Sequence, residues 1–331
     1  MRALVTGGGG FLGAAVVRLL VARGDDVRSL TRGSYPELAA LGVRSFRGDL
    51  SDAQAVRVAA ANCDVVFHVG AKAGIAGSAR EYAATNVAGT DNVIAACREH
   101  GIRALVHTST PSVVSARSGI EGGDESLPYA PRYHSPYPAT KAAAEQAVLA
   151  ANGAGLATVA LRPHLIWGPG DTQLVPRILD RARRGRLRFV GDGSNRIDST
   201  YIDNAAAAHL LAADRLHPGA SIAGRAYFIS QGEPLPIKDL VNGILDAASV
   251  QPVHATIPFP VAYALGAVAE AAFAVAGRRT EPPMTRFLAR QLSTPHWFDI
   301  SAARRDLGYE PRVSIAEGMT LLHEKLASEQ T

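Results

Sequence analysis

The stretch Arg2-Ala3-Leu4-Val5-Thr6-Gly7-Gly8-Gly9-Gly10-Phe11-Leu12-Gly13 decides the fold. Its first five residues form an apolar run that fits a buried parallel strand. Four glycines follow, and residues 11–23 then read as a helix that Gly24 ends. Glycines let the backbone approach a pyrophosphate, and a helix N-terminus supplies aligned N–H groups. The stretch therefore predicts a nucleotide-binding loop between a strand and a helix.

A second motif is Tyr137-Pro138-Ala139-Thr140-Lys141, which places a phenol and an ammonium four residues apart. Residues 139–151 are almost all good helix formers, so we expect both groups on one helix face. We expect Lys141 to lower the pKa of Tyr137. The phenol could then exchange a proton with an alcohol or carbonyl oxygen at neutral pH.

The glycines fit two spacings. Gly8-x-Gly10-x-x-Gly13 matches the common dinucleotide fingerprint, and Gly7-x-x-Gly10-x-x-Gly13 after Thr6 matches the variant of short-chain dehydrogenases. Spacing alone does not choose between them, and the Tyr137–Lys141 pair favours the second.

Strand and helix patterns alternate along the first half of the chain. We expect strands at 27–30, 43–47, 65–69, 104–108 and 158–162, with helices at 52–61, 79–100 and 139–151. Alternation of this kind predicts an α/β fold with a doubly wound parallel sheet of Rossmann type. We expect a dinucleotide-binding domain at 1–165. Residues 166–331 are expected to form mostly a smaller substrate-binding lobe, with some segments returning to the sheet.

Composition excludes several classes of protein. The 331 residues carry a net charge of +4 and two cysteines, so no disulfide framework is expected. Six arginines in 177–188 read as a solvated basic helix, and no nucleic-acid partner is expected. No cluster of residues has metal-ligand spacing, so we expect no metal. A strand that begins at residue 2 leaves no room for a signal peptide, which favours a cytoplasmic protein.

Residues 259–277 form an apolar segment of marginal length for a bilayer. A helix packed over an apolar pocket is the preferred interpretation, and a helix that dips into a membrane surface is the alternative.

The chain resembles an extended short-chain dehydrogenase/reductase over nearly its whole length. Residues 161–163 and 167–171 (Leu-Arg-Pro and Trp-Gly-Pro-Gly-Asp) match the loop after the sixth strand, and 201–204 (Tyr-Ile-Asp-Asn) match a late motif. Within this group the chain is most similar to the 3β-hydroxysteroid dehydrogenase branch, and there to bacterial reductases of olefin biosynthesis. That nearer likeness rests on residues 107–113, 191–195 and 294–298 (His-Thr-Ser-Thr-Pro-Ser-Val, Gly-Asp-Gly-Ser-Asn and Thr-Pro-His-Trp-Phe).

The resemblance implies NADPH-dependent reduction of the ketone of a 2-alkyl-3-oxoalkanoic acid to the 2-alkyl-3-hydroxyalkanoic acid. Tyr137 would give the proton, Thr110 would steady the same oxygen, and Lys141 would bind the nicotinamide ribose; Ser109 is the alternative to Thr110. Asn86 would brace the nucleotide side or simply bond to backbone. The implied cofactor-binding residues are Gly7, Gly10, Phe11, Leu12, Gly13, Thr31, Arg32, Asp49, Leu50, Gly70, Ala71, Asn86, Tyr137, Lys141, Pro163 and Ile166.

The end of the second strand predicts the choice of cofactor. Relatives that prefer NAD carry an acid there, which bonds the ribose 2′-hydroxyl. Here Thr31 takes that position and Arg32 follows, and a guanidinium suits a 2′-phosphate. We expect Asp49 to face the adenine. The sequence therefore predicts NADP(H) in preference to NAD(H).

The resemblance also implies a long-chain apolar substrate, a homodimer, and assembly with other enzymes of the pathway, and 259–277 would make the peripheral membrane contact. Three other functions stay open: a 3β-hydroxysteroid or sterol dehydrogenase, a nucleotide-sugar epimerase or dehydratase, and a non-enzymatic protein that senses NADP. The intact Thr110, Tyr137 and Lys141 argue against the sensor. The apolar residues of 259–275 argue against a sugar nucleotide.

Overall fold

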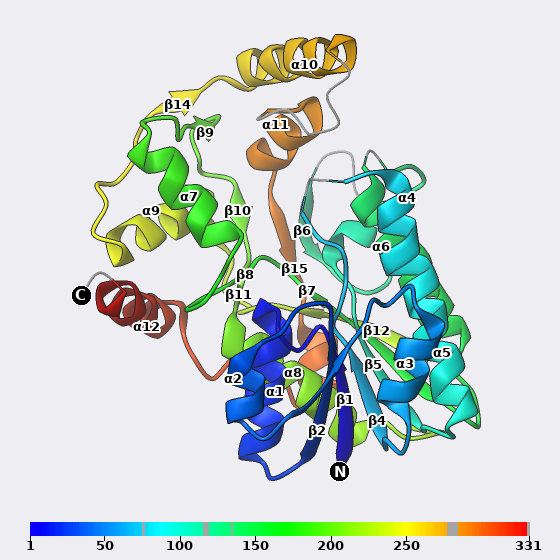
Figure 1. Ribbon diagram of the computed structural model, residues 1–331. Coiled ribbons are helices and arrows are strands. Elements are labelled where there is room, and N and C mark those ends of the chain that lie inside the picture. The colour runs from blue at the N-terminus through cyan, green and yellow to red at the C-terminus, as the bar shows by residue number, and fades with distance from the viewer. Residues whose placement is uncertain (75–76, 115–118, 134, 277–283, 330–331) are drawn as a thin grey trace.

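The computed structural model describes residues 1–74, 77–114, 119–133, 135–276 and 284–329. Seven strands form one parallel sheet in the order β12-β7-β5-β4-β1-β2-β3 (Figure 1). They are β1 (Arg2–Thr6), β2 (Asp26–Thr31), β3 (Arg44–Arg47), β4 (Val65–His68), β5 (Ala104–Thr108), β7 (Ala157–Pro163) and β12 (Arg225–Ile229). The order confirms the predicted doubly wound α/β fold, since the chain leaves β1 first toward one edge and then toward the other.

Helices cover both faces of this sheet (Figure 1). On one face α1 (Phe11–Ala22) packs against α8 (Ile202–Arg215), and on the other α5 (Gly89–Glu99) packs between α3 (Ala53–Ala60) and α6 (Pro136–Ala150). The short α2 (Pro36–Ala40) precedes β3. Every residue of β7 is buried, which agrees with its mostly apolar sequence, and Thr158 and Arg162 are the polar exceptions. Because β12 and α8 come from the second half of the chain, that half supplies one edge strand of the main sheet and one of the helices that cover it.

The predicted helix at 79–100 contains one wide turn. It comprises α4 (Ala79–Tyr82), a π-helical turn (Ala83–Ala88) and α5. Ser78 caps its start, because its hydroxyl accepts from the Glu81 N–H and Glu81 bonds back to the Ser78 N–H. A π turn takes in one extra residue and often occurs at functional sites.

The second half of the chain forms most of a lobe beside the carboxyl edge of the main sheet (Figure 1). The largest sheet of the lobe has the order β13-β10-β15-β6. Two separate pairs of strands, β11–β8 and β14–β9, complete the lobe. The strands are β6 (Ile120–Gly123), β8 (Ile166–Trp167), β9 (Phe189–Val190), β10 (Arg196–Ile197), β11 (Thr200–Tyr201), β13 (Leu235–Pro236), β14 (Thr256–Ile257) and β15 (His296–Phe298). The helices are α7 (Leu174–Arg183), α9 (Ile237–Ala247), α10 (Phe259–Val275), α11 (Arg286–Ser293) and α12 (Ile315–Ser328).

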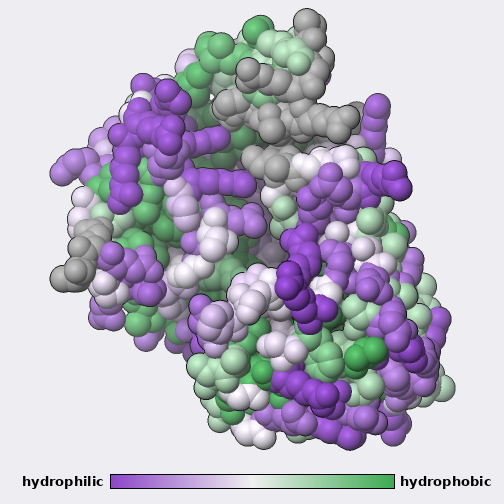
Figure 2. Space-filling model, viewed as in Figure 1, coloured by the Kyte–Doolittle hydropathy of each residue, from purple (hydrophilic) through white to green (hydrophobic). Residues whose placement is uncertain are grey.

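Helix α10 is the segment that the sequence predicted to pack over an apolar pocket. It packs on α11, where the Glu270 carboxylate pairs with Arg286 at 2.7 Å. Leu265 and Val268 are 54% and 67% exposed, and Figure 2 shows hydrophobic surface at the top of the molecule, where Figure 1 places α10. Packing over a pocket stays a prediction for these two side chains. Gly277, the predicted end of the segment, lies outside the described residues.

Among the described residues, no helix combines the length and the apolar character that crossing a bilayer requires.

Candidate active site

The glycine loop lies at the carboxyl end of β1 and fits a nucleotide cofactor. Gly7 has a φ of +71°, and a Cβ atom there would lie 2.7 Å from the Gly70 Cα. A Cβ atom at Gly13 would overlap the Gly7 carbonyl oxygen. Gly10 directly precedes α1 and has no side chain to cap it. The first N–H groups of the helix, at Phe11 and Leu12, are therefore left for an anion. Only glycines permit this close-packed cradle.

The ends of β2 and β3 supply the residues predicted to read the adenosine. Thr31 ends β2, and its hydroxyl donates to the Gly33 carbonyl at 3.0 Å. Arg32 is exposed, and no described residue bonds its guanidinium. Backbone and hydroxyl hydrogen bonds from Ser51, together with the charge of Arg32, hold the pKa of Asp49 below its ordinary value. The structure therefore brings Asp49 and Arg32 to the same edge.

A buried chain of hydrogen bonds runs from the glycine loop to the π turn. The Gly70 N–H donates to the Thr6 hydroxyl, which lies 2.9 Å from His68 Nδ1. The Thr90 hydroxyl lies 2.9 Å from His68 Nε2 and donates to the Asn86 carbonyl. That last bond fixes the direction of the others, so Nε2 carries the ring proton and Nδ1 accepts. Burial lowers the pKa of His68 to about 3, which keeps the ring neutral.

Asn86 lies in the π turn and connects the loop after β4 to α6. Its amide oxygen accepts from the Lys72 N–H at 2.7 Å, and its amide nitrogen donates to the Lys72 carbonyl and to the Thr140 hydroxyl, both at 3.1 Å. Asn86 therefore holds the segment after β4, which contains Gly70 and Ala71, against the helix that carries the tyrosine. Leu50, after β3, is buried at the same edge.

Thr110 and Tyr137 meet at the carboxyl end of β5. Thr110 follows the strand, and Tyr137 lies in the first turn of α6. Thr110 lies close enough to the phenol of Tyr137 to lower its pKa, while the Thr110 hydroxyl donates to Ser112 Oγ at 3.3 Å. Ser109, the alternative to Thr110, is buried with no partner for its hydroxyl among the described residues. Of the two hydroxyls, that of Thr110, which the sequence analysis preferred, is the one beside the phenol.

The electrostatics of the pair differ from the sequence-based expectation. Burial raises the pKa of Tyr137, and Thr110 opposes this in part. The expected lowering by Lys141 was wrong, because Lys141 Nζ donates to the Thr108 carbonyl and lies 3.4 Å from His107 Nε2. Burial lowers the pKa of Lys141 to about 8, and Glu145 opposes that effect.

Two charged residues that the sequence analysis missed lie below Lys141. Glu145 accepts from Arg162 through both carboxylate oxygens, at 2.6 and 3.0 Å, and both side chains are buried. The Tyr129 hydroxyl also donates to Glu145 at 2.7 Å. Tyr137, Lys141 and Glu145 follow one another at four-residue steps on α6, so extending the same spacing would have found the third. This pair anchors α6 to β7.

The residues after β7 face the lobe. Pro163 ends the strand, and Ile166 begins β8. Between them, His164 Nδ1 pairs with the Asp198 carboxylate, whose other oxygen accepts from the Phe298 N–H at 2.9 Å. The sequence analysis passed over His164 and Asp198, because they lie 34 residues apart without a motif to connect them.

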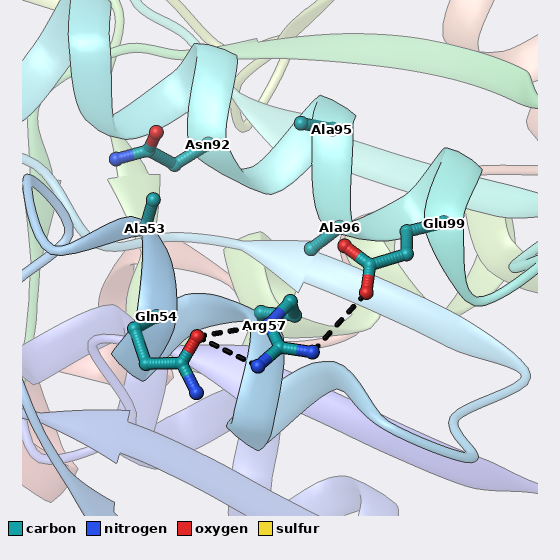
Figure 3. A pocket seen from close by; sticks show the side chains of 7 residues that line it. All are labelled: Ala53, Gln54, Arg57, Asn92, Ala95, Ala96 and Glu99. Atoms are coloured by element: carbon teal, nitrogen blue, oxygen red, sulfur yellow. Dashed lines mark hydrogen bonds and ion pairs between the residues drawn. The ribbon is translucent and has the colours of Figure 1, made fainter.

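The surface has two hollows at different places in the fold. Figure 2 shows a recess between the lobe and the main sheet, above the strand ends just described. Figure 3 shows a separate cavity of about 170 Å³ between α3 and α5. Arg57 spans it, bonded to Gln54 and to Glu99. Its charged groups are already paired, so we assign no chemistry to the second cavity.

Comparison with known proteins identifies relatives over the full chain. The model of the 3-beta hydroxysteroid dehydrogenase/isomerase family matches residues 4–261. A 2-alkyl-3-oxoalkanoate reductase of Stenotrophomonas maltophilia (strain K279a) is 59% identical and covers 99% of this chain and 100% of its own length. A protein of the same name from Shewanella oneidensis is 48% identical, with 98% and 86% covered. A 3 beta-hydroxysteroid dehydrogenase/Delta 5-->4-isomerase of Mycobacterium tuberculosis is 35% identical, with 96% and 88% covered.

Solved structures agree with the fold. The crystal structure of gox2253 is 28% identical with a TM-score of 0.82, and 99% of this chain and 98% of that one are covered. MoeE5 in complex with UDP-glucose and NAD is 25% identical with a TM-score of 0.76 over 100% of both chains. The chain therefore belongs to the 3-beta hydroxysteroid dehydrogenase/isomerase family, a branch of the extended short-chain dehydrogenases/reductases, which are NAD(P)-dependent oxidoreductases.

Proposed function

We propose that this protein reduces the 3-oxo group of a 2-alkyl-3-oxoalkanoic acid to a hydroxyl group, with NADPH as the reductant. The observation that carries the proposal is the placement of Thr110 beside Tyr137 at the end of β5, with Lys141 one turn further along α6. Two relatives that span the chain bear the name 2-alkyl-3-oxoalkanoate reductase, which supports this substrate class.

The hydroxyl pair suits reduction of a ketone. Because burial raises the pKa of Tyr137, the phenol is protonated at neutral pH and can give its proton to the substrate oxygen. Thr110 donates a second hydrogen bond to the same oxygen. NADPH, when bound, supplies the hydride that reduces the ketone carbon. General acid catalysis by Tyr137 would contribute about 10²- to 10⁴-fold to the rate.

Lys141 lies where it can act on both the cofactor and the tyrosine. We assign it to the nicotinamide ribose hydroxyls, with Pro163 and Ile166 flanking the ring. A pKa of about 8 keeps the Lys141 ammonium charged near neutral pH, but close to the pH at which it releases its proton. The charged group therefore favours return of a proton to the site after Tyr137 has given one up.

The preference for NADPH rests on Thr31 and Arg32. No acid ends β2, and the exposed Arg32 has no described partner that would have to be displaced. A charge-assisted bond from its guanidinium to the 2′-phosphate would favour NADPH over NADH. The pyrophosphate would lie on the first turn of α1, at Gly10 and Gly13.

A substrate panel tests the proposal. The purified protein is incubated with NADPH or NADH and a 2-alkyl-3-oxoalkanoic acid, a 3-oxosteroid or a UDP-sugar, and oxidation of the cofactor is followed by absorbance. We expect turnover of the acid with NADPH, rising with alkyl length, and loss of that turnover in Tyr137→Phe. Preference for the steroid would favour the function named for the mycobacterial relative. Preference for the UDP-sugar would favour an epimerase-like function.

A further inference from the structure

His164 and Asp198 form a buried pair between the end of β7 and the start of β8. Asp198 is 1% exposed, and it accepts from His164 Nδ1 and from the Phe298 N–H. His164 is 12% exposed at its side chain, and no described residue bonds its Nε2. Asp198 therefore fixes the orientation of the ring and leaves one nitrogen open.

His164 lies on the face of the sheet that carries α6. Its N–H donates to the Ile229 carbonyl, so the ladder of β7 continues through it and alternation places it on the same face as Arg162. Ring contacts agree. The Arg162 guanidinium lies over Phe228, Phe228 stacks on Phe298 at 4.2 Å, and Phe298 meets His164 edge-on at 5.4 Å.

The height of His164 on that face matches the catalytic pair. Glu145 of α6 contacts Arg162 of β7, so we measure heights along the helix from Glu145 and along the strand from Arg162. Toward the carboxyl edge, Lys141 then lies about 6 Å and Tyr137 about 12 Å above Glu145 along the helix. His164 lies about 6.6 Å above Arg162 along the strand. Its side chain is therefore at a height between Lys141 and Tyr137.

Charge favours an anion at this position. A buried carboxylate is costly without a cation, and among the described residues His164 is the one that forms an ion pair with Asp198. His296 is adjacent, but burial lowers its pKa to about 4, so it stays neutral at neutral pH. When the His164 ring is protonated, its Nε2–H is a charge-assisted donor directed at the open side.

We propose that His164, oriented by Asp198, binds the C1 carboxylate of the substrate while its 3-oxo group meets Tyr137 and Thr110. One carbon atom separates the carboxylate from the ketone in such a substrate, so both groups fit between neighbouring strand ends. The inference rests on the proposed function and adds a recognition element to it. His164 would be a specificity residue, and Asp198 a positioning residue that acts through it.

The test compares an acid with its methyl ester, which has the same reacting carbon but no charge. Because 3-oxo acids lose CO₂ readily, the reaction is run in the oxidative direction with NADP⁺ and a 2-alkyl-3-hydroxyalkanoic acid. The variants are His164→Gln and Asp198→Asn. His323→Gln is the control, an exposed histidine on α12 that donates to the Ala247 carbonyl on α9. NADPH binding and circular dichroism establish that each variant is folded.

We expect His164→Gln to lower kcat/KM for the acid by about 10- to 100-fold and to leave the ester within about threefold, since a charge-assisted bond has been lost. Asp198→Asn should lower the ratio of acid to ester in the same direction, which a purely structural role would not do. The control should leave both substrates unchanged. An unchanged ratio of acid to ester in a folded His164→Gln, with the wild type active on the acid, would overturn the inference alone. A wild type inactive on both substrates would overturn the proposed function.

Discussion

Replacing Lys141 by Met should change how the stability of the protein depends on pH. The ammonium is buried, and its pKa falls from an ordinary 10.5 to about 8. Between these two values the unfolded chain holds a proton that the folded chain has lost. Because the unfolded state binds more protons there, the free energy of unfolding rises with pH across this window. Below about pH 8 both states are charged, and the folded state bears the full cost of the buried charge.

The magnitude follows from the same two values. The interval from about 8 to 10.5 corresponds to about 3 kcal/mol, at about 1.4 kcal/mol for each pH unit. The wild type should therefore gain about 3 kcal/mol over Lys141→Met between about pH 7 and pH 11. Most other titrating groups are common to both chains, so they largely cancel from the difference.

Urea unfolding of both proteins without cofactor, followed by circular dichroism at several pH values, measures this difference. Lys325→Met is the matched control, because Lys325 is exposed and pairs only with Glu329 on the surface of α12. Its difference from the wild type should stay within about 0.5 kcal/mol at every pH. A Lys141→Met difference that is flat, or that falls as pH rises, would refute the argument from burial.

Three other substitutions test the site. Tyr137→Phe should abolish turnover and leave NADPH affinity within a few-fold, as fluorescence titration would show; turnover near the wild-type rate would remove Tyr137 as proton donor. Arg32→Ala should weaken NADPH binding by about 10- to 100-fold and leave NADH nearly untouched, whereas equal losses would show that Arg32 does not read the 2′-phosphate. Gly13→Ala should lower affinity for both cofactors, because its Cβ would overlap the Gly7 carbonyl, and unchanged affinities would argue against the cradle.

The main sheet could be predicted because its signals are local. An apolar strand followed by a glycine loop needs no distant partner, and the strand at Ala104–Thr108 has the predicted bounds. The Tyr137–Lys141 spacing likewise placed both groups on one helix. The lobe had no such signal, since strands of two or three residues such as β10 and β15 form only through pairing with segments far along the chain.

The site was predicted where a motif exists and missed where a distant contact makes it. Spacing located Tyr137, but its pKa depends on burial, which only the fold determines. Lys141 was expected to act on the phenol, but its ammonium donates a hydrogen bond to the carbonyl of Thr108, where β5 ends. Asp198 reaches His164 through tertiary structure alone. Which side of α10 faces outward could not be predicted, because composition does not specify which face a helix buries.

The π turn has a consequence for insertions and deletions. In a regular α-helix, side chains at eight-residue separation drift by about 80° around the axis, since each residue advances 100°. Tyr82 and Thr90 stand at that separation, with Asn86 midway between them, yet all three reach partners within residues 68–74, because the wide turn absorbs one residue. Removing one residue beside Asn86 within 83–88 would restore a regular helix and leave its two ends aligned, because the residue that the wide turn absorbs would be gone. Only the side chains inside the turn would change direction, so such a deletion would move Asn86 relative to the loop after β4. An insertion at the same place would instead rotate the two ends against each other by about 100°.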